Sequence, residues 1–235
     1  MTDLNSHPIT ALWSPADAGK IQLYSFPTPN GVKVSITLEE LGLPYEAHLA
    51  HLGNDDQKTR EFLSLNPNGK IPAIIDPNGP AGEPIGIFES GAILLYLAEK
   101  TGKLIPSDPA QRVECIQWLF FQKAGIGPMF GQLGHFYKNM AGKLKDDYPT
   151  QRYLNETKRL LEVLDGRLDG RQWILGDQYT IADIATFPWV RSVRDFYKAG
   201  EAVGLGGFKN VTRWLEVCMA RPASQKGLNI PPRPQ

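Results

Sequence analysis

The sequence predicts an α/β domain followed by an all-helical domain, and two observations lead to this prediction. From Ile21 to about Leu104, short apolar stretches typical of strands alternate with helical patterns. From Gln111 onward, long helical patterns follow one another without a convincing strand pair. We therefore expect an N-terminal extension draped on the surface or flexible at 1–20, an α/β domain at 21–104, a linker at 105–111, an all-helical domain at 112–222 and an extended, proline-rich tail at 223–235.

The individual elements follow from local patterns. In the first region, strands are expected at 21–26, 45–52, 70–76 and 84–89, and helices within the segments 30–42, 58–66 and 90–102. The first of these helices would place Val34, Leu38 and Leu41 on one face, and Gly42 lies just beyond its end. In the second region, helices are expected at roughly 110–142, 150–170, 180–199 and 208–220.

Composition excludes several classes of function. The chain has 235 residues, with 25 basic and 25 acidic side chains, so bulk charge favours neither nucleic acid nor a membrane surface as a partner. Only two cysteines occur, Cys115 and Cys218, which disfavours a disulfide scaffold, a zinc site or a dithiol and fits a reducing cytosol. We expect both to be buried hydrophobes. The start of the chain is not a secretory signal, and the longest apolar run, at 92–98, is too short to span a bilayer.

The turn between the first strand and the first helix has the sequence TPNG, at 28–31. Strand-to-helix junctions of α/β proteins often hold the reactive groups, and a redox protein would carry a cysteine here. This turn offers only Thr28, Pro29, Asn30 and Gly31. The sequence therefore leaves open what supplies a reactive atom.

The second informative stretch is NPNGKIPAI, in which a turn leads into a strand that contains Pro72. Because proline cannot donate to a sheet ladder, it belongs at an edge, a bulge or a cis bond. In the cis form, Ile71 could turn its N–H and C=O toward an extended peptide. An ordinary trans edge proline is the alternative.

The third stretch is FESG, where a helix begins. We expect Ser90 to be the N-cap and Glu89 to place a carboxylate at the positive end of the helix. Such an end can bind a ligand carboxylate, and Glu89 can bind a ligand ammonium. Taken alone, simple capping explains the pattern better. Thr180 and Asp183 have capping-box spacing, which we interpret as structural only.

The remaining candidates are weaker. His48 and His51 lie close together without a further ligand cluster, so no metal site is expected. The aromatic-rich segment after Trp118 is typical of core packing, although Phe120, Phe130 or His135 could line a cleft.

Together, these segments resemble the glutathione transferases over about residues 21–222. The motifs PTPNG, NPNGKIPAI and FESGAILLYLAEKTG are similar to the Nu-class and yeast prion-protein-like branch, whose bacterial members are glutathione-dependent disulfide-bond oxidoreductases. The resemblance implies an N-terminal thioredoxin-like domain followed by an all-helical glutathione transferase C-terminal domain. It also implies that glutathione is the co-substrate and that its sulfur, without a metal, is the reactive atom.

The resemblance assigns roles to nine residues. Thr28 would donate its hydroxyl to the sulfur, and Asn30 would stabilise the thiolate, whereas Tyr24 is not expected to contact it. Ile71 would pair with the cysteinyl backbone, with Pro72 holding the cis turn. The other implied glutathione contacts are Gln57, Lys70, Glu89, Ser90 and Arg152. Lys70 and Arg152 could equally be solvated, and Arg152 could reach the ligand across a dimer.

The resemblance leaves three functional interpretations. The first is disulfide reduction, with organic peroxidase activity as an extension. The second is a conventional transferase that conjugates hydrophobic electrophiles in detoxification, and the third is a non-enzymatic glutathione-binding regulator. A cytoplasmic homodimer is implied in each case.

Overall fold

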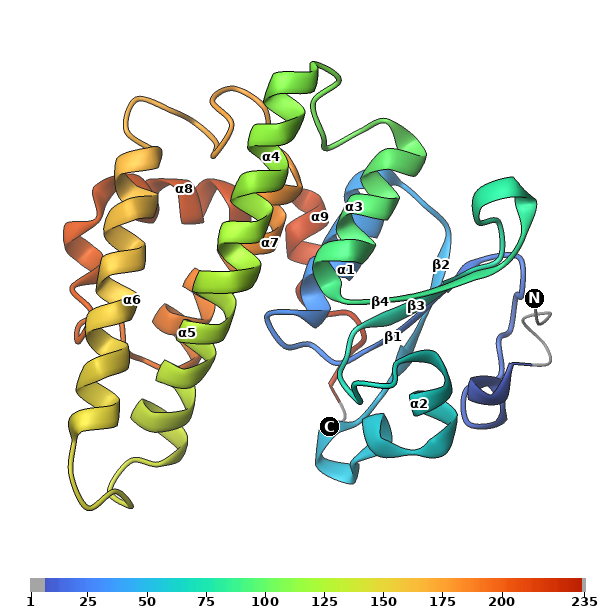
Figure 1. Ribbon diagram of the computed structural model, residues 1–235, viewed down its shortest axis with the longest axis horizontal. Helices are drawn as coiled ribbons and strands as arrows, with labels where there is room; N and C mark the ends of the chain where they lie inside the picture. Colours follow the sequence, from blue (N-terminus) through green and yellow to red (C-terminus); the bar gives the residue numbers. More distant parts are fainter. Residues whose placement is uncertain (1–6, 234–235) are drawn as a thin grey trace. The chain divides into compact units, whose positions relative to one another are not determined.

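The computed structural model describes residues 7–233, apart from the side chain of Ala81 (Figure 1). The described parts of Met1–Thr101 and Pro222–Gln235 form one compact unit, and Gly102–Arg221 form a second. None of the described helices is long and apolar enough to cross a membrane.

The first unit is built on a mixed four-stranded sheet. Its strands are β1 (Ile21–Ser25), β2 (Tyr45–Leu49), β3 (Ala73–Asp76) and β4 (Ile85–Phe88), in the order β2-β1-β3-β4. β1 is parallel to β2 and antiparallel to β3, and β4 is antiparallel to β3. Its helices are α1 (Gly31–Leu41), α2 (Arg60–Leu65), α3 (Ser90–Thr101) and α9 (Pro222–Gly227), with short 3-10 turns η2 (Pro8–Ala11), η3 (Leu52–Asn54), η4 (Asp56–Lys58) and η5 (Pro80–Gly82). The four strands and the first three α-helices lie in the predicted segments, and the fold is thioredoxin-like.

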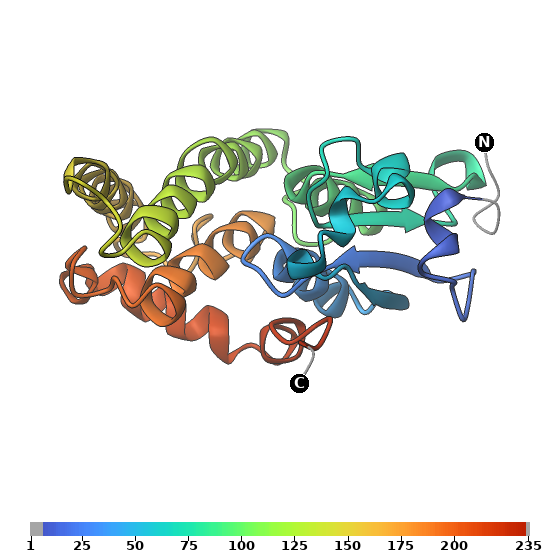
Figure 2. The same cartoon turned by 90° about the horizontal axis from the view of Figure 1, so that it is seen from below.

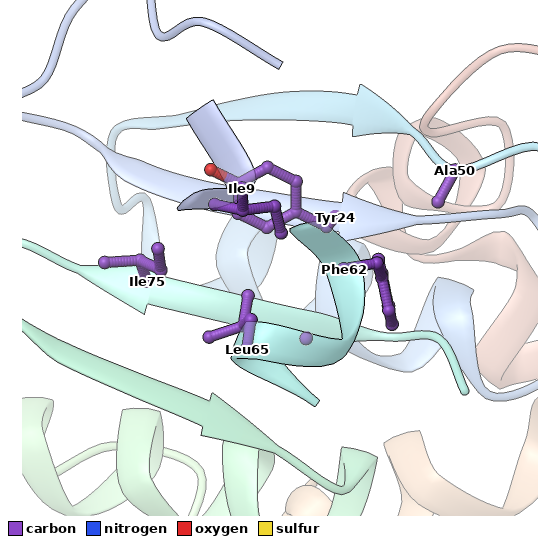
Figure 3. Close-up of a cluster of buried hydrophobic side chains, with 7 residues drawn as sticks. Ile9, Tyr24, Ala50, Phe62, Leu65 and Ile75 are labelled. Carbon is purple, nitrogen blue, oxygen red and sulfur yellow. The ribbon is translucent and has the colours of Figure 1, made fainter. Parts of the chain in front are cut away.

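Helices cover both faces of this sheet (Figure 1). Since side chains alternate along a strand, Leu23 and Ile74 face α1 and α3, whereas Tyr24 and Ile75 face the opposite side. There they join a hydrophobic cluster with α2 and η2 (Figure 3). The cluster consists of Ile9, Tyr24, Ala50, Phe62, Leu65, Ala73 and Ile75. Nearly all of these side chains are inaccessible to solvent.

The structure differs from the expected N-terminal extension at residues 7–20; the rest of that segment lies outside the described residues. Ile9 is fully buried in the cluster, and the Trp13 indole N–H donates to the Leu49 carbonyl at 3.0 Å. A 3-10 turn of four residues leaves no hydrophobic periodicity in the sequence, so only the tertiary contacts define this segment as part of the domain.

The C-terminal segment also differs from the expected extended tail. Pro222–Gly227 form α9, which packs beside α1 (Figure 2). The Ser35 hydroxyl donates to the Gly227 carbonyl at 2.6 Å, and Lys226 pairs with Glu39 at 2.8 Å. The tail as far as residue 233 therefore starts with a helix that completes the first unit.

The second unit is helical, as predicted. It consists of α4 (Pro109–Phe121), η6 (Gln122–Ile126), α5 (Gly127–Leu133), η7 (Gly134–Asn139), α6 (Tyr148–Arg167), α7 (Ile181–Arg191), η8 (Ser192–Phe196), η9 (Leu205–Gly207) and α8 (Lys209–Ala220). The continuous helix expected over 110–142 is interrupted by the π-helical turns η6 and η7. Pro128, at the start of α5, has no N–H to donate, which accounts for the break in the α-helical ladder at η6.

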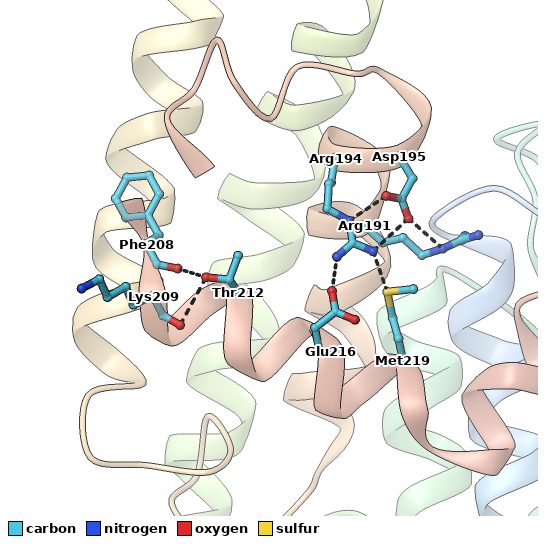
Figure 4. A network of polar contacts seen from close by, with 8 residues as sticks. All are labelled: Arg191, Arg194, Asp195, Phe208, Lys209, Thr212, Glu216 and Met219. Carbon is cyan, nitrogen blue, oxygen red and sulfur yellow. Dashed lines mark hydrogen bonds and ion pairs between the residues drawn. The ribbon is translucent and has the colours of Figure 1, made fainter. Parts of the chain in front are cut away.

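Two polar networks hold the second unit together. The predicted capping box at the start of α7 is present, and Asp183 also accepts from the Ile174 N–H at 2.9 Å and from the Trp214 indole at 2.8 Å. The second network joins η8 to α8 (Figure 4). There, Arg194 binds Asp195 at 2.6 Å, pairs with Glu216 and donates to the Met219 sulfur at 3.2 Å.

Candidate functional site

The turn after β1 is organised around Thr28. The Thr28 hydroxyl oxygen accepts from the Gly31 N–H at 3.3 Å, and its carbonyl accepts from the Val32 N–H at 3.0 Å. A hydroxyl has one donor hydrogen besides its acceptor lone pairs. Thr28 is half-buried, so this hydrogen can serve a ligand at the start of α1.

Asn30 occupies the N-cap position of α1 but does not cap the helix with its side chain. Instead, its Oδ1 atom accepts from the Lys33 ammonium at 2.9 Å. Lys33 was not among the predicted site residues, because a single lysine in a helical pattern is usually solvated. The structure shows it fully buried.

The loop before β3 presents Ile71. The Ile71–Pro72 peptide bond is cis, in agreement with the predicted cis proline. Asn66 organises this loop, since its Nδ2 donates to the Lys70 carbonyl at 2.5 Å and its Oδ1 accepts from the Asn68 N–H at 3.0 Å. Lys70 is exposed and Ile71 half-buried. The role of Asn66 could not be inferred from the sequence, in which the NPNG segment indicates only a turn.

The FESG segment differs in detail from the prediction. Glu89, not Ser90, precedes the first turn of α3, and the Glu89 carbonyl accepts from the Ile93 N–H at 2.9 Å. Glu89 has a φ of +71°, so the chain turns sharply from β4 into α3. Ser90 is the first residue of the helix and is buried, whereas Glu89 is exposed. The carboxylate still lies at the positive end of the helix.

Gln57 lies in the short turn η4 after β2. It is 8% exposed, and its Oε1 atom is buried without a hydrogen-bond partner among the described residues. Its carbonyl oxygen is close to Gly69, where an added Cβ would stand 3.2 Å away. The Gln57 segment therefore packs against the loop that leads to Ile71.

The sheet topology brings the segments of the first unit that hold predicted site residues to one edge of the sheet, the edge at which β1 ends. Because β1 and β2 are parallel, the residues that follow them, Thr28 and Gln57, are at the same edge. β3 is antiparallel to β1, so the loop before it, with Pro72, is at that edge too. β4 is antiparallel to β3, which places Glu89 there as well. Four segments far apart in sequence thus lie at the edge of the sheet from which the chain enters α1.

Comparison with known proteins identifies this arrangement. The model for the glutathione S-transferase N-terminal domain matches residues 28–100, and the model for the C-terminal domain matches residues 128–222. The chain is 45% identical over 210 residues to the disulfide-bond oxidoreductase YfcG of Escherichia coli, covering 88% of this chain and 94% of that protein. The chain belongs to the glutathione S-transferase family.

Solved structures of glutathione transferases are similar over the whole length. One from Burkholderia graminis, with two glutathione molecules bound per subunit, is 62% identical with a TM-score of 0.97, covering 100% of this chain and 98% of that one. One from Pseudomonas putida, with one glutathione disulfide bound per subunit, is 56% identical with a TM-score of 0.96, covering 98% and 100%. The predicted family and fold are confirmed.

Both cysteine thiols of this glutathione S-transferase lie in the described part of the chain, and neither is accessible. Cys115 and Cys218 are both buried, as predicted, and burial raises the pKa of Cys115 to about 11. Tyr24 is fully buried in the hydrophobic cluster, and burial also raises its pKa. The Tyr24 hydroxyl is itself buried.

In the second unit of this glutathione S-transferase, Arg152 lies exposed on α6. It lines a depression of about 600 Å³ with Met129, Tyr148, Gln151, Tyr153, Asn155, Glu156 and Arg159. Of the three residues considered for a cleft, Phe130 is a fully buried core residue, whereas Phe120 and His135 are exposed. No group of side chains suited to a metal ion occurs in residues 7–233.

Proposed function

We propose that this glutathione S-transferase is a glutathione-dependent disulfide-bond oxidoreductase in which bound glutathione supplies the thiolate. The observation that carries the proposal is the contrast between the two buried cysteines and the two polar side chains, Thr28 and Asn30, at the start of α1. A helix N-terminus and hydrogen-bond donors favour a thiolate over a thiol. The name of YfcG, a disulfide-bond oxidoreductase, supports the same activity.

The proposed contacts follow the geometry of the edge. Ile71 would pair its backbone with the cysteinyl residue of glutathione, with Pro72 holding the turn. Glu89 would bind the γ-glutamyl ammonium, and Ser90, with the first N–H groups of α3, its carboxylate. Gln57 and Lys70 would bind polar ends of the same ligand, and Arg152 would contribute from the helical unit or from a second subunit.

The reaction proceeds by two thiol–disulfide exchanges. The glutathione thiolate, next to Thr28 and Asn30, attacks one sulfur of the substrate disulfide and releases the other as a thiolate, which takes up a proton. A second glutathione then attacks the mixed disulfide, so that the substrate leaves as its second thiol and glutathione disulfide forms. The two bacterial structures, one with two glutathione molecules and one with glutathione disulfide bound per subunit, support this order of steps. Attack of the same thiolate on a peroxide oxygen would give peroxidase activity.

The test compares two substrates and two variants. We expect fast reduction of 2-hydroxyethyl disulfide, weak conjugation of a chlorinated dinitrobenzene, and loss of disulfide turnover in Thr28→Ala and Asn30→Ala. Asn78→Ala is the matched control, because Asn78 follows β3 at the opposite edge of the sheet. Strong conjugation with negligible disulfide turnover would make this chain a detoxifying transferase. Binding of glutathione without turnover of either substrate would identify this chain as a non-enzymatic regulator.

We also propose that the protein is a homodimer in the cytoplasm. Large apolar side chains are exposed on both units: Phe88 on the edge strand β4, and Val113 and Phe120 on α4. Val113 and Phe120 are seven residues apart and share one helix face. Light scattering after size-exclusion chromatography should give the mass of a dimer for the native chain and of a monomer for Phe120→Glu. A monomeric native chain would contradict the proposal.

A further inference from the structure

Lys33 is a fully buried lysine in the first turn of α1. Lysine is almost never fully buried, because removing an ammonium group from water costs several kcal/mol unless it is compensated. Its position adds a second cost, since a cation near a helix N-terminus is unfavourable to the helix dipole. A fully buried lysine beside a candidate site is therefore a candidate for a functional role.

The contact between Lys33 and Asn30 determines how the Asn30 amide is oriented. Lysine has three N–H donors and no acceptor, so it can bind only the oxygen end of an amide. The observed bond of 2.9 Å to Asn30 Oδ1 therefore fixes which end of the amide faces Lys33. The opposite end carries N–H donors, the type of group that stabilises a thiolate. A hydrogen bond to the oxygen also polarises the amide and strengthens those donors.

The surroundings hold this pair in place. Gly31, next to Asn30, fits against Phe26 so closely that an added Cβ would stand 1.9 Å from the Phe26 carbonyl oxygen. α1 packs against β1, α3 and α9. The ion pair of Glu39 and Lys226 lies nearly two helical turns beyond Lys33 along α1, toward the C-terminal end of the helix.

We propose that Lys33 is a positioning residue for disulfide reduction, which orients the Asn30 amide so that its N–H donors face the glutathione sulfur and whose buried charge favours the thiolate. The inference rests on the proposed function, because it assigns a role within the same site. Lys33 itself does not touch the reacting sulfur. Lys33 stabilises the thiolate indirectly, by orienting the Asn30 amide and by its positive charge.

Three variants test the proposal. Lys33→Met keeps the length of the side chain and removes the charge and the donors, whereas Lys33→Arg keeps both. Lys20→Met is the matched control, because Lys20 is partly exposed and lies before β1, at the opposite edge of the sheet from Thr28. Lys33→Gln, which keeps a donor without the charge, replaces Lys33→Met if that variant does not fold in a thermal unfolding measurement.

The decisive measurement is the pH profile of kcat/KM for a small disulfide. We expect Lys33→Met to lose about tenfold at neutral pH, the effect of raising the pKa of the bound thiol by one. The loss should shrink as the pH rises and both enzymes become fully ionised. Lys33→Arg should recover most of the activity, and Lys20→Met should match the native chain. An equal loss at every pH, or none, would overturn the proposal.

Two further measurements separate the possible failures. In an Asn30→Ala background, Lys33→Met should reduce kcat/KM by less than it does in the native chain, because the two residues act as a unit; fully additive losses would contradict positioning. The ultraviolet absorbance of the thiolate, followed during a pH titration of bound glutathione, needs no turnover. Loss of the thiolate absorbance in Lys33→Met would support the role of Lys33 even if the enzyme reduced no disulfide. The absence of disulfide reduction would refute only the proposed function.

Discussion

The carbonyl oxygen of Phe26 lies 1.9 Å from the position that a Cβ atom on Gly31 would occupy. Only a residue without a side chain fits at this point, where the chain turns from β1 into α1. The Ser25 hydroxyl, 2.5 Å from the same position, closes the other side. Gly31 therefore fixes the course of the turn that holds Thr28 and Asn30.

Gly31→Ala should consequently destabilise the fold and abolish glutathione-dependent activity together. The obstructing atom belongs to the backbone and cannot rotate away, so we expect a loss of about 3 kcal/mol in the free energy of unfolding, at the upper end of overpacking effects. Urea unfolding and disulfide turnover measure the two effects. Gly166→Ala on α6, where an added Cβ would meet no atom within 4 Å outside the adjacent helix backbone, should be neutral or slightly stabilising. Retained stability and activity in Gly31→Ala would contradict this account of the turn.

Glu89→Gly should separate stability from ligand binding. The native φ of +71° is strained for glutamate and relaxed for glycine, so the variant should gain about 1 kcal/mol in the free energy of unfolding. It also lacks the proposed partner of the γ-glutamyl ammonium, and glutathione should bind at least about tenfold more weakly. Lys198→Gly, at a φ of +58° in the second unit, should show the gain alone. Calorimetric titration measures the affinity of each variant for glutathione. An unchanged affinity in Glu89→Gly would exclude the proposed role of Glu89 in binding the γ-glutamyl ammonium.

Asp183→Asn should change both the stability and its pH dependence. Burial raises the pKa of Asp183 from an ordinary value of 3.8 to about 6 and outweighs the opposing effect of the N–H donors. Between these two values the folded state binds more protons than the unfolded state, so the stability due to this group falls as the pH rises. The decrease, on the order of 3 kcal/mol, should end above about pH 6.

The variant has no titrating group at this position and should lack that slope. At neutral pH it should also be less stable by about 2 kcal/mol, because the amide has one oxygen in place of two. Its NH₂ group would face either the Thr180 N–H or the donors of Ile174 and Trp214. Chemical denaturation at a series of pH values measures both effects. Asp169→Asn, on an exposed residue, should keep the native slope. A slope shared by the native chain and Asp183→Asn would show that another group is responsible.

Gly227→Ala should detach α9 from α1. An added Cβ would stand 2.7 Å from the Ile36 backbone, and the hydrogen bond from Ser35 would lengthen as the helices separate. We expect a loss of about 2 kcal/mol and faster proteolysis near Pro222. Gly207→Ala, whose added Cβ would meet no atom within 4 Å beyond the neighbouring residues, is the control. Unchanged protease resistance would mean that α1 can accommodate the added atom.

The elements that sequence reasoning placed correctly depend on local patterns. The short apolar stretch around Tyr24 and the capping-box spacing of Thr180 and Asp183 are set by residues within one strand or turn. The Ile71–Pro72 cis bond was one of two local alternatives and is present. These features need no knowledge of what packs against them.

The features that could not be predicted depend on contacts across the chain. Ile9 is apolar but has no periodic neighbours, so its burial in the sheet cluster is visible only in the structure. Lys33 follows a helical pattern that gives no sign of its burial. Glu89 precedes α3 in place of the expected cap Ser90, because the reversal from β4 requires a positive φ that the sequence does not indicate.

The pairing of α9 with α1 has a consequence for the order of folding during synthesis. The segment that covers part of α1 emerges from the ribosome about 190 residues later, after the whole helical unit. The domain that is made first is therefore the last to be completed, and until then the surface of α1 around Ser35 and Ile36 stays uncovered. Nascent chains of this protein should expose that apolar surface to chaperones for most of their translation.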